Sequence, residues 1–236
     1  MTLPTIVTPT YELTVPSTKK VIKYRPFLVK EEKLLLMAKE TDSILDNIET
    51  IKQIIENCII SSININRLST FDIEYIFIQL RSKSVGNIIK LNYEHDCPNN
   101  EGQEEIKFNL DLDKVVVHNN NENNIKKIND NINVIMKYPT FKSLQNIDLN
   151  DNIISDINII IDSIEYITDN DTKHNATDYT SIEIAEFLEA LTSKQLKSIY
   201  NFFENIPTTE YNTSIKCQSC EFTKEIKITG ITDFFV

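Results

Sequence analysis

The sequence predicts an α+β protein in which two helical blocks are combined with antiparallel β-hairpins. Residues 28–84 are rich in apolar residues that recur every three or four positions, which is typical of helices, and residues 132–206 hold a strand followed by more such segments. In residues 87–117 and again in residues 209–236 the apolar and polar residues alternate, which is typical of hairpins. Both predicted hairpins carry cysteine at the turn, so the two could pair as a degenerate zinc ribbon.

Length and composition limit the possible classes of protein. A chain of 236 residues can bury a full core, and we expect a single body over residues 24–236 that is preceded by an extended arm over residues 1–23. The net charge of −11 argues against nucleic acid as a partner, because phosphate binding needs clustered Lys and Arg. We also expect no membrane span and no export signal, since the sequence has no run of about 18 apolar residues and the N-terminus carries prolines and threonines.

The N-terminal arm and the first helical block come first along the chain. Prolines and β-formers predict that the arm is extended, either mobile or lying along a partner or along the body of the protein. A helix is predicted over 29–40, with Glu31 and Glu32 in the first turn, where the helix dipole favours negative charge. A second helix, capped by Thr41 or Asp42, is expected to end near Ile60. A third helix over 71–81 is apolar around nearly its whole circumference, which predicts burial on two sides.

The remaining elements follow from alternation and from helix-start signals. We expect strands at 88–93 and 106–110, an extended piece at 115–117, a polar loop at 118–131 and a strand at 132–136. A short helix near Phe141 and a helix over 151–168 should follow, then a polar loop over 168–179. Thr180 and Thr192 each begin a capping box, so helices are predicted over 181–191 and 193–205. A closing hairpin should pair 211–216 with 222–228.

One segment at the start of the body carries a resemblance. Residues 25–36 read Arg-Pro-Phe-Leu-Val-Lys-Glu-Glu-Lys-Leu-Leu-Leu, and residues 71–77 read Phe-Asp-Ile-Glu-Tyr-Ile-Phe. Together with Leu-Arg-Ser-Lys-Ser-Val-Gly at 80–86, they resemble the baseplate hub proteins of T4-like bacteriophages, a family of tail assembly factors. The resemblance covers roughly residues 20–90 and is looser elsewhere.

The resemblance implies a non-enzymatic hub assembly factor or structural component that acts by protein–protein binding. Its partners would be other baseplate hub or tail proteins, and it would be found in the host cytoplasm during phage assembly or in the virion tail baseplate. We expect Arg25 and Phe27, on either side of Pro26, to form an element that docks a partner or anchors the core. The candidate partner-binding residues are Arg25, Pro26, Phe27, Lys30, Glu31, Phe71 and Phe77.

The cysteines at the two predicted turns are the candidate metal ligands. Cys217 and Cys220 have the spacing of a zinc knuckle, and the other turn offers His95 and Cys97. A full zinc ribbon has a Cys-x-x-Cys pair in each hairpin, whereas here Asn100 stands at the position of the fourth cysteine. The sequence therefore leaves two alternatives open, zinc held by three cysteines and His95 or a metal-free hairpin with free thiols, and it favours the second. A redox motif is not favoured, because β-formers flank the cysteines on both sides.

The sequence gives little support for an enzyme. It contains no phosphate loop, no nucleophile elbow and no His-Glu-x-x-His, and its three histidines fall in predicted turns or loops. A cell-wall hydrolase therefore has no motif behind it. Besides the hub protein, the alternative that we retain is a zinc-ribbon adaptor in a regulatory complex.

Overall fold

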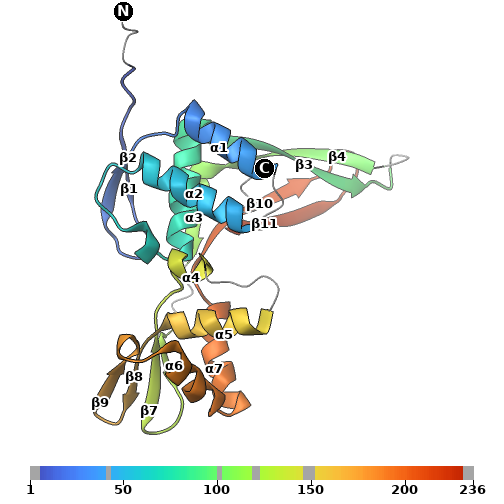
Figure 1. Cartoon of the computed structure of the whole chain (residues 1–236). Helices are drawn as coiled ribbons and strands as arrows, with labels where there is room; N and C mark the ends of the chain where they lie inside the picture. The colour runs from blue at the N-terminus through green and yellow to red at the C-terminus, as the bar shows by residue number, and fades with distance from the viewer. Residues whose placement is uncertain (1–5, 41–43, 100–102, 119–122, 146–151, 231–236) are drawn as a thin grey trace, which may run out of the picture. The chain divides into compact units, whose positions relative to one another are not determined.

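The computed structural model describes residues 6–40, 44–99, 103–118, 123–145 and 152–230. The chain folds into two compact units, each drawn in Figure 1. Unit 1 consists of residues 1–63, 71–118 and 208–236, and unit 2 of residues 64–70 and 119–207. Each unit has buried apolar clusters of its own. The single body expected over residues 24–236 stays a prediction.

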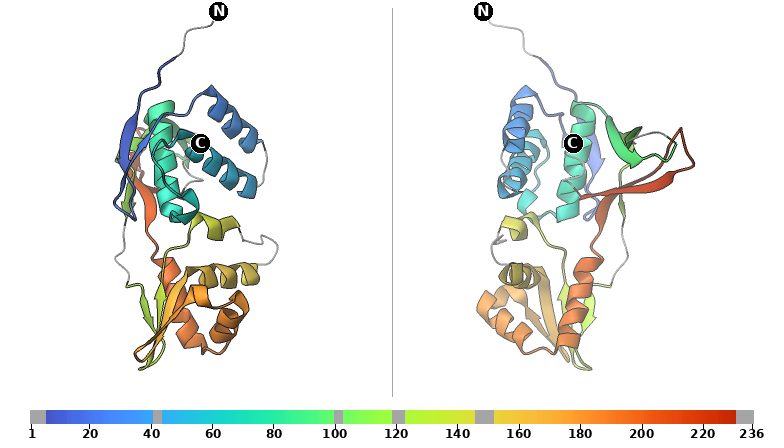
Figure 2. Two further views of the ribbon diagram at one scale, coloured as in Figure 1. Left: turned by 60° about the vertical axis from the view of Figure 1, so that its left-hand side comes forward. Right: turned by 90° about the vertical axis from the view of Figure 1, so that its right-hand side faces the viewer.

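Among the described residues of unit 1, three helices form the first layer. They are α1 (Val29–Lys39), α2 (Ile44–Cys58) and α3 (Thr70–Ser84). All three were predicted from apolar spacing; the proposed caps Thr41 and Asp42 lie outside the described residues. Helix α3 is buried on both sides, as predicted. It lies between the α1–α2 pair and the β-strands of unit 1, which are described next (Figure 2).

The N-terminal arm forms a hairpin. Strand β1 (Tyr11–Thr14) pairs antiparallel with β2 (Val21–Tyr24), and the turn between them places Lys19 at a φ of 57°. The backbone N–H and the hydroxyl of Ser17 both donate to the carboxylate of Asp72, a fully buried residue of α3. These bonds attach the described part of the arm to the body of unit 1.

The remaining strands of unit 1 form two sheets. Strand β3 (Ile88–Asp96) pairs with β4 (Gln103–Asp111), and the second sheet has the order β11-β10-β5. Its strands are β5 (Val116–His118), β10 (Thr208–Lys216) and β11 (Thr223–Thr229). Ile78 of α3 and apolar residues of both sheets, such as Leu110 and Tyr211, form one buried cluster. The β3–β4 hairpin thereby packs against the β10–β11 hairpin.

Unit 2 combines a four-stranded sheet with four helices among its described residues. The sheet order is β6-β7-β8-β9, and neighbouring strands are antiparallel. The strands are β6 (Ile125–Lys127), β7 (Ile132–Met136), β8 (Ile164–Asp169) and β9 (Thr172–Asn175), and the helices are α4 (Phe141–Gln145), α5 (Asn152–Ser163), α6 (Ser181–Glu189) and α7 (Ser193–Glu204). Their core is centred on residues such as Val134, Ile164 and Phe202. Single 3-10 turns occur at Ile65–Arg67 and Ala176–Asp178 in this unit and at Leu112–Lys114 in unit 1.

Unit 2 is also where the predicted elements fail most clearly. The helix expected over 151–168 ends at Ser163, and the rest of that segment is strand β8. The polar loop expected over 168–179 contains β9, and the loop expected over 118–131 contains β6. Both capping boxes are confirmed, with Thr180 and Thr192 as the N-cap residues of α6 and α7. No helix in the described ranges is long and apolar enough to cross a membrane.

Candidate metal centre

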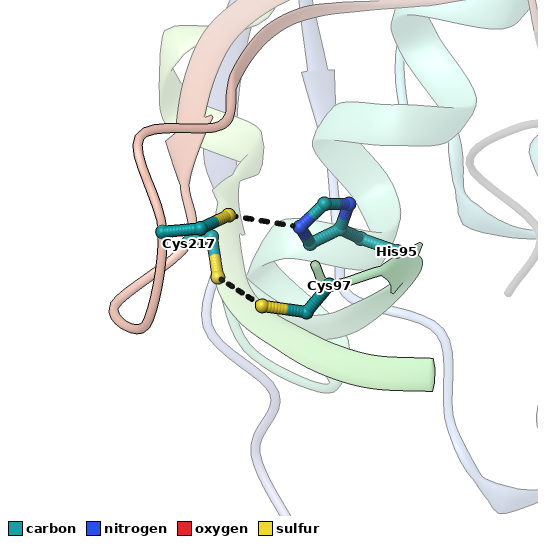
Figure 3. Close-up of side chains that lie close together, drawn as sticks. His95, Cys97 and Cys217 are labelled. Atoms are coloured by element: carbon teal, nitrogen blue, oxygen red, sulfur yellow. Dashed lines mark hydrogen bonds between the residues drawn. The ribbon is translucent and has the colours of Figure 1, made fainter. Parts of the chain in front are cut away.

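The two hairpins of unit 1 bring the four predicted ligands together. His95 is the next-to-last residue of β3 and Cys97 follows the strand directly, while Cys217 directly follows β10 and Cys220 lies in the turn before β11. Figure 3 shows His95, Cys97 and Cys217 pointing toward one another from the two hairpins. Asn100, which the sequence analysis placed outside the ligand set, lies outside the described residues.

The spacing of the four donor atoms is close to that of a tetrahedral site. The imidazole nitrogen and the three sulfurs all lie within 4.8 Å of one another. His95 Nε2 is 3.2 Å from Cys220 Sγ, and Cys97 Sγ is 3.9 Å from Cys217 Sγ. Zinc–sulfur bonds of about 2.3 Å in a tetrahedron place two sulfurs about 3.8 Å apart. Only small shifts would bring all four donors to that separation.

Apolar side chains enclose the cluster. Cys97 and Cys217 are buried together with Ile106 and Ile215 from the facing strands. The ring of Phe222 stacks on the imidazole of His95 with 4.1 Å between centroids and an interplanar angle of 13°. This stacking holds the imidazole plane and so fixes the direction in which Nε2 points.

A carboxylate borders the cluster on one side. Glu104, on β4, accepts a hydrogen bond from the Cys217 thiol at 3.4 Å and another from the Ser219 hydroxyl at 2.9 Å. These contacts join the two hairpins next to the cysteines. The sequence analysis missed Glu104, because one acidic residue just before the strand predicted over 106–110 carries no signal of a site.

The cysteine side chains differ in acidity. Burial raises the pKa of the Cys97 thiol to about 11. The backbone N–H of Phe222 is the largest cause that lowers the pKa of Cys220 to about 7, and the nearby His95 lowers it further. Hydrogen bonds to the charged form thus favour a thiolate at Cys220, whereas desolvation opposes one at Cys97.

Three sulfurs and one imidazole form a donor set with a well-defined chemistry. Thiolate and imidazole ligands suit zinc, and four protein ligands close a tetrahedral site without leaving a position for a substrate or a reactive water. Such a centre would be structural. The residues present therefore fit a structural zinc ion, and they do not fit a catalytic one.

The predicted partner-binding residues surround a different cluster, at the start of α1. Arg25 Nη2 contacts Glu31 Oε1 at 2.9 Å and donates to the Asn57 carbonyl at 2.9 Å. Glu31, which is fully buried, also accepts from the Leu28 backbone N–H at 2.8 Å. The Arg25 guanidinium lies 3.6 Å from Cys58 Sγ in α2. These bonds connect the segment before α1 with the end of α2.

Most of the predicted partner-binding side chains are in the interior. The buried ones are Pro26, Phe27, Glu31, Phe71 and Phe77. Arg25 is largely covered, and Lys30 is exposed. Of the two roles predicted for Arg25 and Phe27, this burial favours core anchoring, because a side chain that docks a partner has to be accessible.

A pocket in unit 2 collects polar residues that the sequence analysis assigned to a loop. It has a volume of about 420 Å³, and its walls include Asp169, His174 and Tyr179 besides Ile132 and Phe187. His174 Nδ1 lies 2.7 Å from the Tyr179 hydroxyl. This hydrogen bond joins two side chains of the pocket wall.

The comparison with known protein families decides the family. A family model described as T4 bacteriophage base plate protein matches residues 8–236, which is nearly the whole chain. The chain belongs to this family. No curated protein and no solved structure gives a significant match. The match includes residues 20–90, where the resemblance was noted, and it supports a structural or assembly role in the phage baseplate.

Proposed function

We propose that this baseplate protein is a non-enzymatic component or assembly factor of the baseplate hub that acts by binding other hub or tail proteins. The family match over residues 8–236 carries the proposal at the level of the baseplate. The assignment to the hub rests on the resemblance of residues 25–36, 71–77 and 80–86 to hub proteins. The zinc-ribbon adaptor considered as an alternative is not favoured, because membership of a baseplate family gives the chain a different setting.

An exposed apolar surface in unit 1 supports a binding role. We call Leu28, Val29, Leu36 and Val85 the α1 apolar surface. Val29 is 66 % exposed, Leu36 58 % and Val85 63 %. Val85 lines two adjoining pockets, one shared with Leu28 and Val29 and the other with Leu36. Val29 and Leu36 are seven residues apart and so face the same way along the helix.

The occupant that we assign to this surface is an apolar segment of another hub protein. Large apolar side chains that remain grouped at a surface commonly mark protein–protein contacts. The buried residues beneath it, among them Phe27 and Phe77, hold the surface in shape from the core. Phe27 and Phe77 therefore support the α1 apolar surface from below, and the exposed residues of that surface contact the partner.

Co-expression with individual hub proteins of the same phage tests the proposal. The tagged full-length chain should co-purify with one of them. The double variant Val29→Glu with Leu36→Lys should lose this partner. It leaves the net charge unchanged, and it puts the acid at the N-terminal end of α1 and the base near its C-terminal end, where the helix dipole favours each of them. Ile182→Glu, at a 71 % exposed position of α6, is the matched control and should retain the partner.

Two results would contradict the proposal. One is that no hub protein co-purifies with the parent chain. The other is that the double variant, with an unchanged melting temperature, binds its partner as tightly as the parent does.

A further inference from the structure

Each of the three cysteine sulfurs at the tips of the hairpins has the same kind of contact with a backbone N–H. The Cys217 sulfur accepts from the backbone N–H of Ser219, and the Cys220 sulfur accepts from that of Phe222, both at 3.4 Å. The Cys97 sulfur accepts in the same way from the backbone N–H of Asn99. In each case the donor lies two residues after the cysteine. These N–H groups hold the sulfur atoms of the two turns in the positions from which they converge within 4.8 Å of one another.

Zinc binds cysteine as the thiolate, so three cysteine ligands would each lose a proton when the ion binds. The sulfurs lie within 4.8 Å of one another, and the carboxylate of Glu104 is in contact with Cys217. Three thiolates beside a carboxylate in a largely buried cluster would repel one another strongly. A dication at the centre removes this repulsion, and a neutral His95 can supply the fourth ligand through Nε2.

We propose that His95, Cys97, Cys217 and Cys220 bind one Zn²⁺ ion that links the β3–β4 hairpin to the β10–β11 hairpin. The ion is structural, because its four ligands all come from the protein. It joins positions 120 residues apart in the sequence, between Cys97 and Cys217. A link over so long a loop restricts the unfolded chain, so binding of the ion contributes to folding stability.

Two other states of the same residues compete with this proposal. In the first, the cluster is free of metal and a hydrogen bond of 3.2 Å joins His95 Nε2 to the Cys220 sulfur. In the second, Cys97 and Cys217 form a disulfide from their present separation of 3.9 Å. Neither state contains a bound metal. They differ from each other in mass, because the disulfide form has two hydrogen atoms fewer than the form with free thiols.

The first measurement uses the unmodified full-length protein. Purified under reducing conditions without a chelator, it should contain about one zinc ion per chain by elemental analysis. Replacement of zinc by Co²⁺ should give the visible absorption of tetrahedral cobalt, together with sulfur-to-cobalt charge-transfer bands. Removal of the ion should lower the melting temperature, and added Zn²⁺ should restore it.

Matched variants then assign the ligands. Cys97→Ser should reduce the zinc content to a small fraction of one per chain, whereas Cys58→Ser, which changes a fully buried thiol in α2, should keep the full amount. His95→Ala should weaken cobalt binding at least tenfold, because one ligand is lost. His118→Ala, which changes an exposed histidine of the same unit, should leave cobalt binding unchanged.

The outcomes separate the proposal from its rivals. A reduced parent protein that binds less than a tenth of an ion of either metal overturns the proposal in favour of the metal-free cluster. A mass lower by two hydrogen atoms under native conditions, with no metal bound, overturns it in favour of the disulfide. Equal zinc in the parent and in Cys97→Ser overturns the assigned ligands. None of these results bears on hub binding, which co-purification tests separately.

Discussion

Removal of the Arg25 guanidinium should destabilise unit 1 far more than removal of a second cation that contacts the same carboxylate. Arg25 and Lys30 both lie within ion-pair distance of Glu31 Oε1, at 2.9 Å and 3.4 Å. The Arg25 side chain is 16 % exposed and the Lys30 side chain 68 %, while that of Glu31 is fully buried. Arg25→Met leaves a buried carboxylate without its main partner, whereas Lys30→Met removes a contact that faces water.

The expected sizes of the two effects follow from burial. Breaking a buried ion pair by removing one partner costs about 3–5 kcal/mol, and an exposed pair contributes about 0–1 kcal/mol. For a chain of this size, each kcal/mol lowers the melting temperature by about 2–4 °C. Arg25→Met should therefore lower the melting temperature of the protein by roughly 6 °C or more. Lys30→Met should lower it by less than about 4 °C.

The pH dependence gives a second measure of the same pair. Burial alone would raise the pKa of Glu31, but the hydrogen bonds from Arg25 and from the Leu28 backbone outweigh it, so the pKa lies below its ordinary value. A carboxyl group with a lowered pKa stabilises the fold above its unfolded-state pKa, and this contribution is lost as the pH falls through the folded-state pKa. The difference in stability between the parent and Arg25→Met should thus be largest at neutral pH and shrink in acid.

Thermal and urea unfolding of the parent and both variants, followed by circular dichroism between pH 3 and pH 8, would measure these effects. Equal losses in Arg25→Met and Lys30→Met would refute the argument, because burial would then not decide the strength of the pair. A difference that stays constant from neutral to acid pH would show that the loss comes from packing of the Arg25 stem and not from its charge.

Three further predictions concern other parts of the chain. Thr180→Ala and Thr192→Ala should each cost about 1 kcal/mol in urea unfolding, because each removes the N-cap hydrogen bond of a confirmed capping box, and equal stability of variant and parent would contradict this. Phe202→Ala should cost about 3–5 kcal/mol, since that ring is 1 % exposed in the core of unit 2, while Tyr200→Ala, on the exposed side of the same helix, should cost much less. The protein should not bind duplex DNA at micromolar concentration in physiological salt, because its net charge is −11; a salt-dependent gel shift in that range would require a basic patch.

The ligand cluster was predictable because its signals are local. Cysteines at two turns, with alternating residues on either side, place four donor groups at the tips of two hairpins. The meeting of the hairpins was expected from their chemistry, and the structure brings the four donor atoms within 4.8 Å of one another. The contribution of Glu104 could not be predicted, because it depends on which residue of β4 comes opposite Cys217.

The missed strand β8 shows a limit of periodicity. The isoleucine-rich segment continues from α5 into β8 without a glycine or a proline, so the sequence gives no sign that the helix ends at Ser163. The end is set by tertiary contacts: the Ser163 carbonyl accepts from the backbone N–H of Lys137, and β8 is paired on both edges by β7 and β9. Pairing of distant strands outweighs local helix propensity here.

The N-terminal hairpin was missed for a related reason. Its turn has a positive φ at Lys19, where a glycine or an asparagine would have signalled the reversal. The hydrogen bonds from Ser17 to Asp72 join residues 55 positions apart, so they too leave no local trace in the sequence. The arm could be recognised as extended from its composition, but its partner strand could not.

The pairing of β5 with β10 has a consequence for synthesis of the chain on the ribosome. His118 and Thr208 are partners in that sheet, although about ninety residues of unit 2 are translated between them. At about 5–20 residues per second, the N-terminal part of unit 1 waits roughly 5–20 s before its last two strands are made. During this interval the faces of α3 and of the β3–β4 hairpin that β10 and β11 later cover remain open. The nascent protein therefore exposes apolar surface for seconds, and a cellular chaperone that binds such surfaces would have time to act on it.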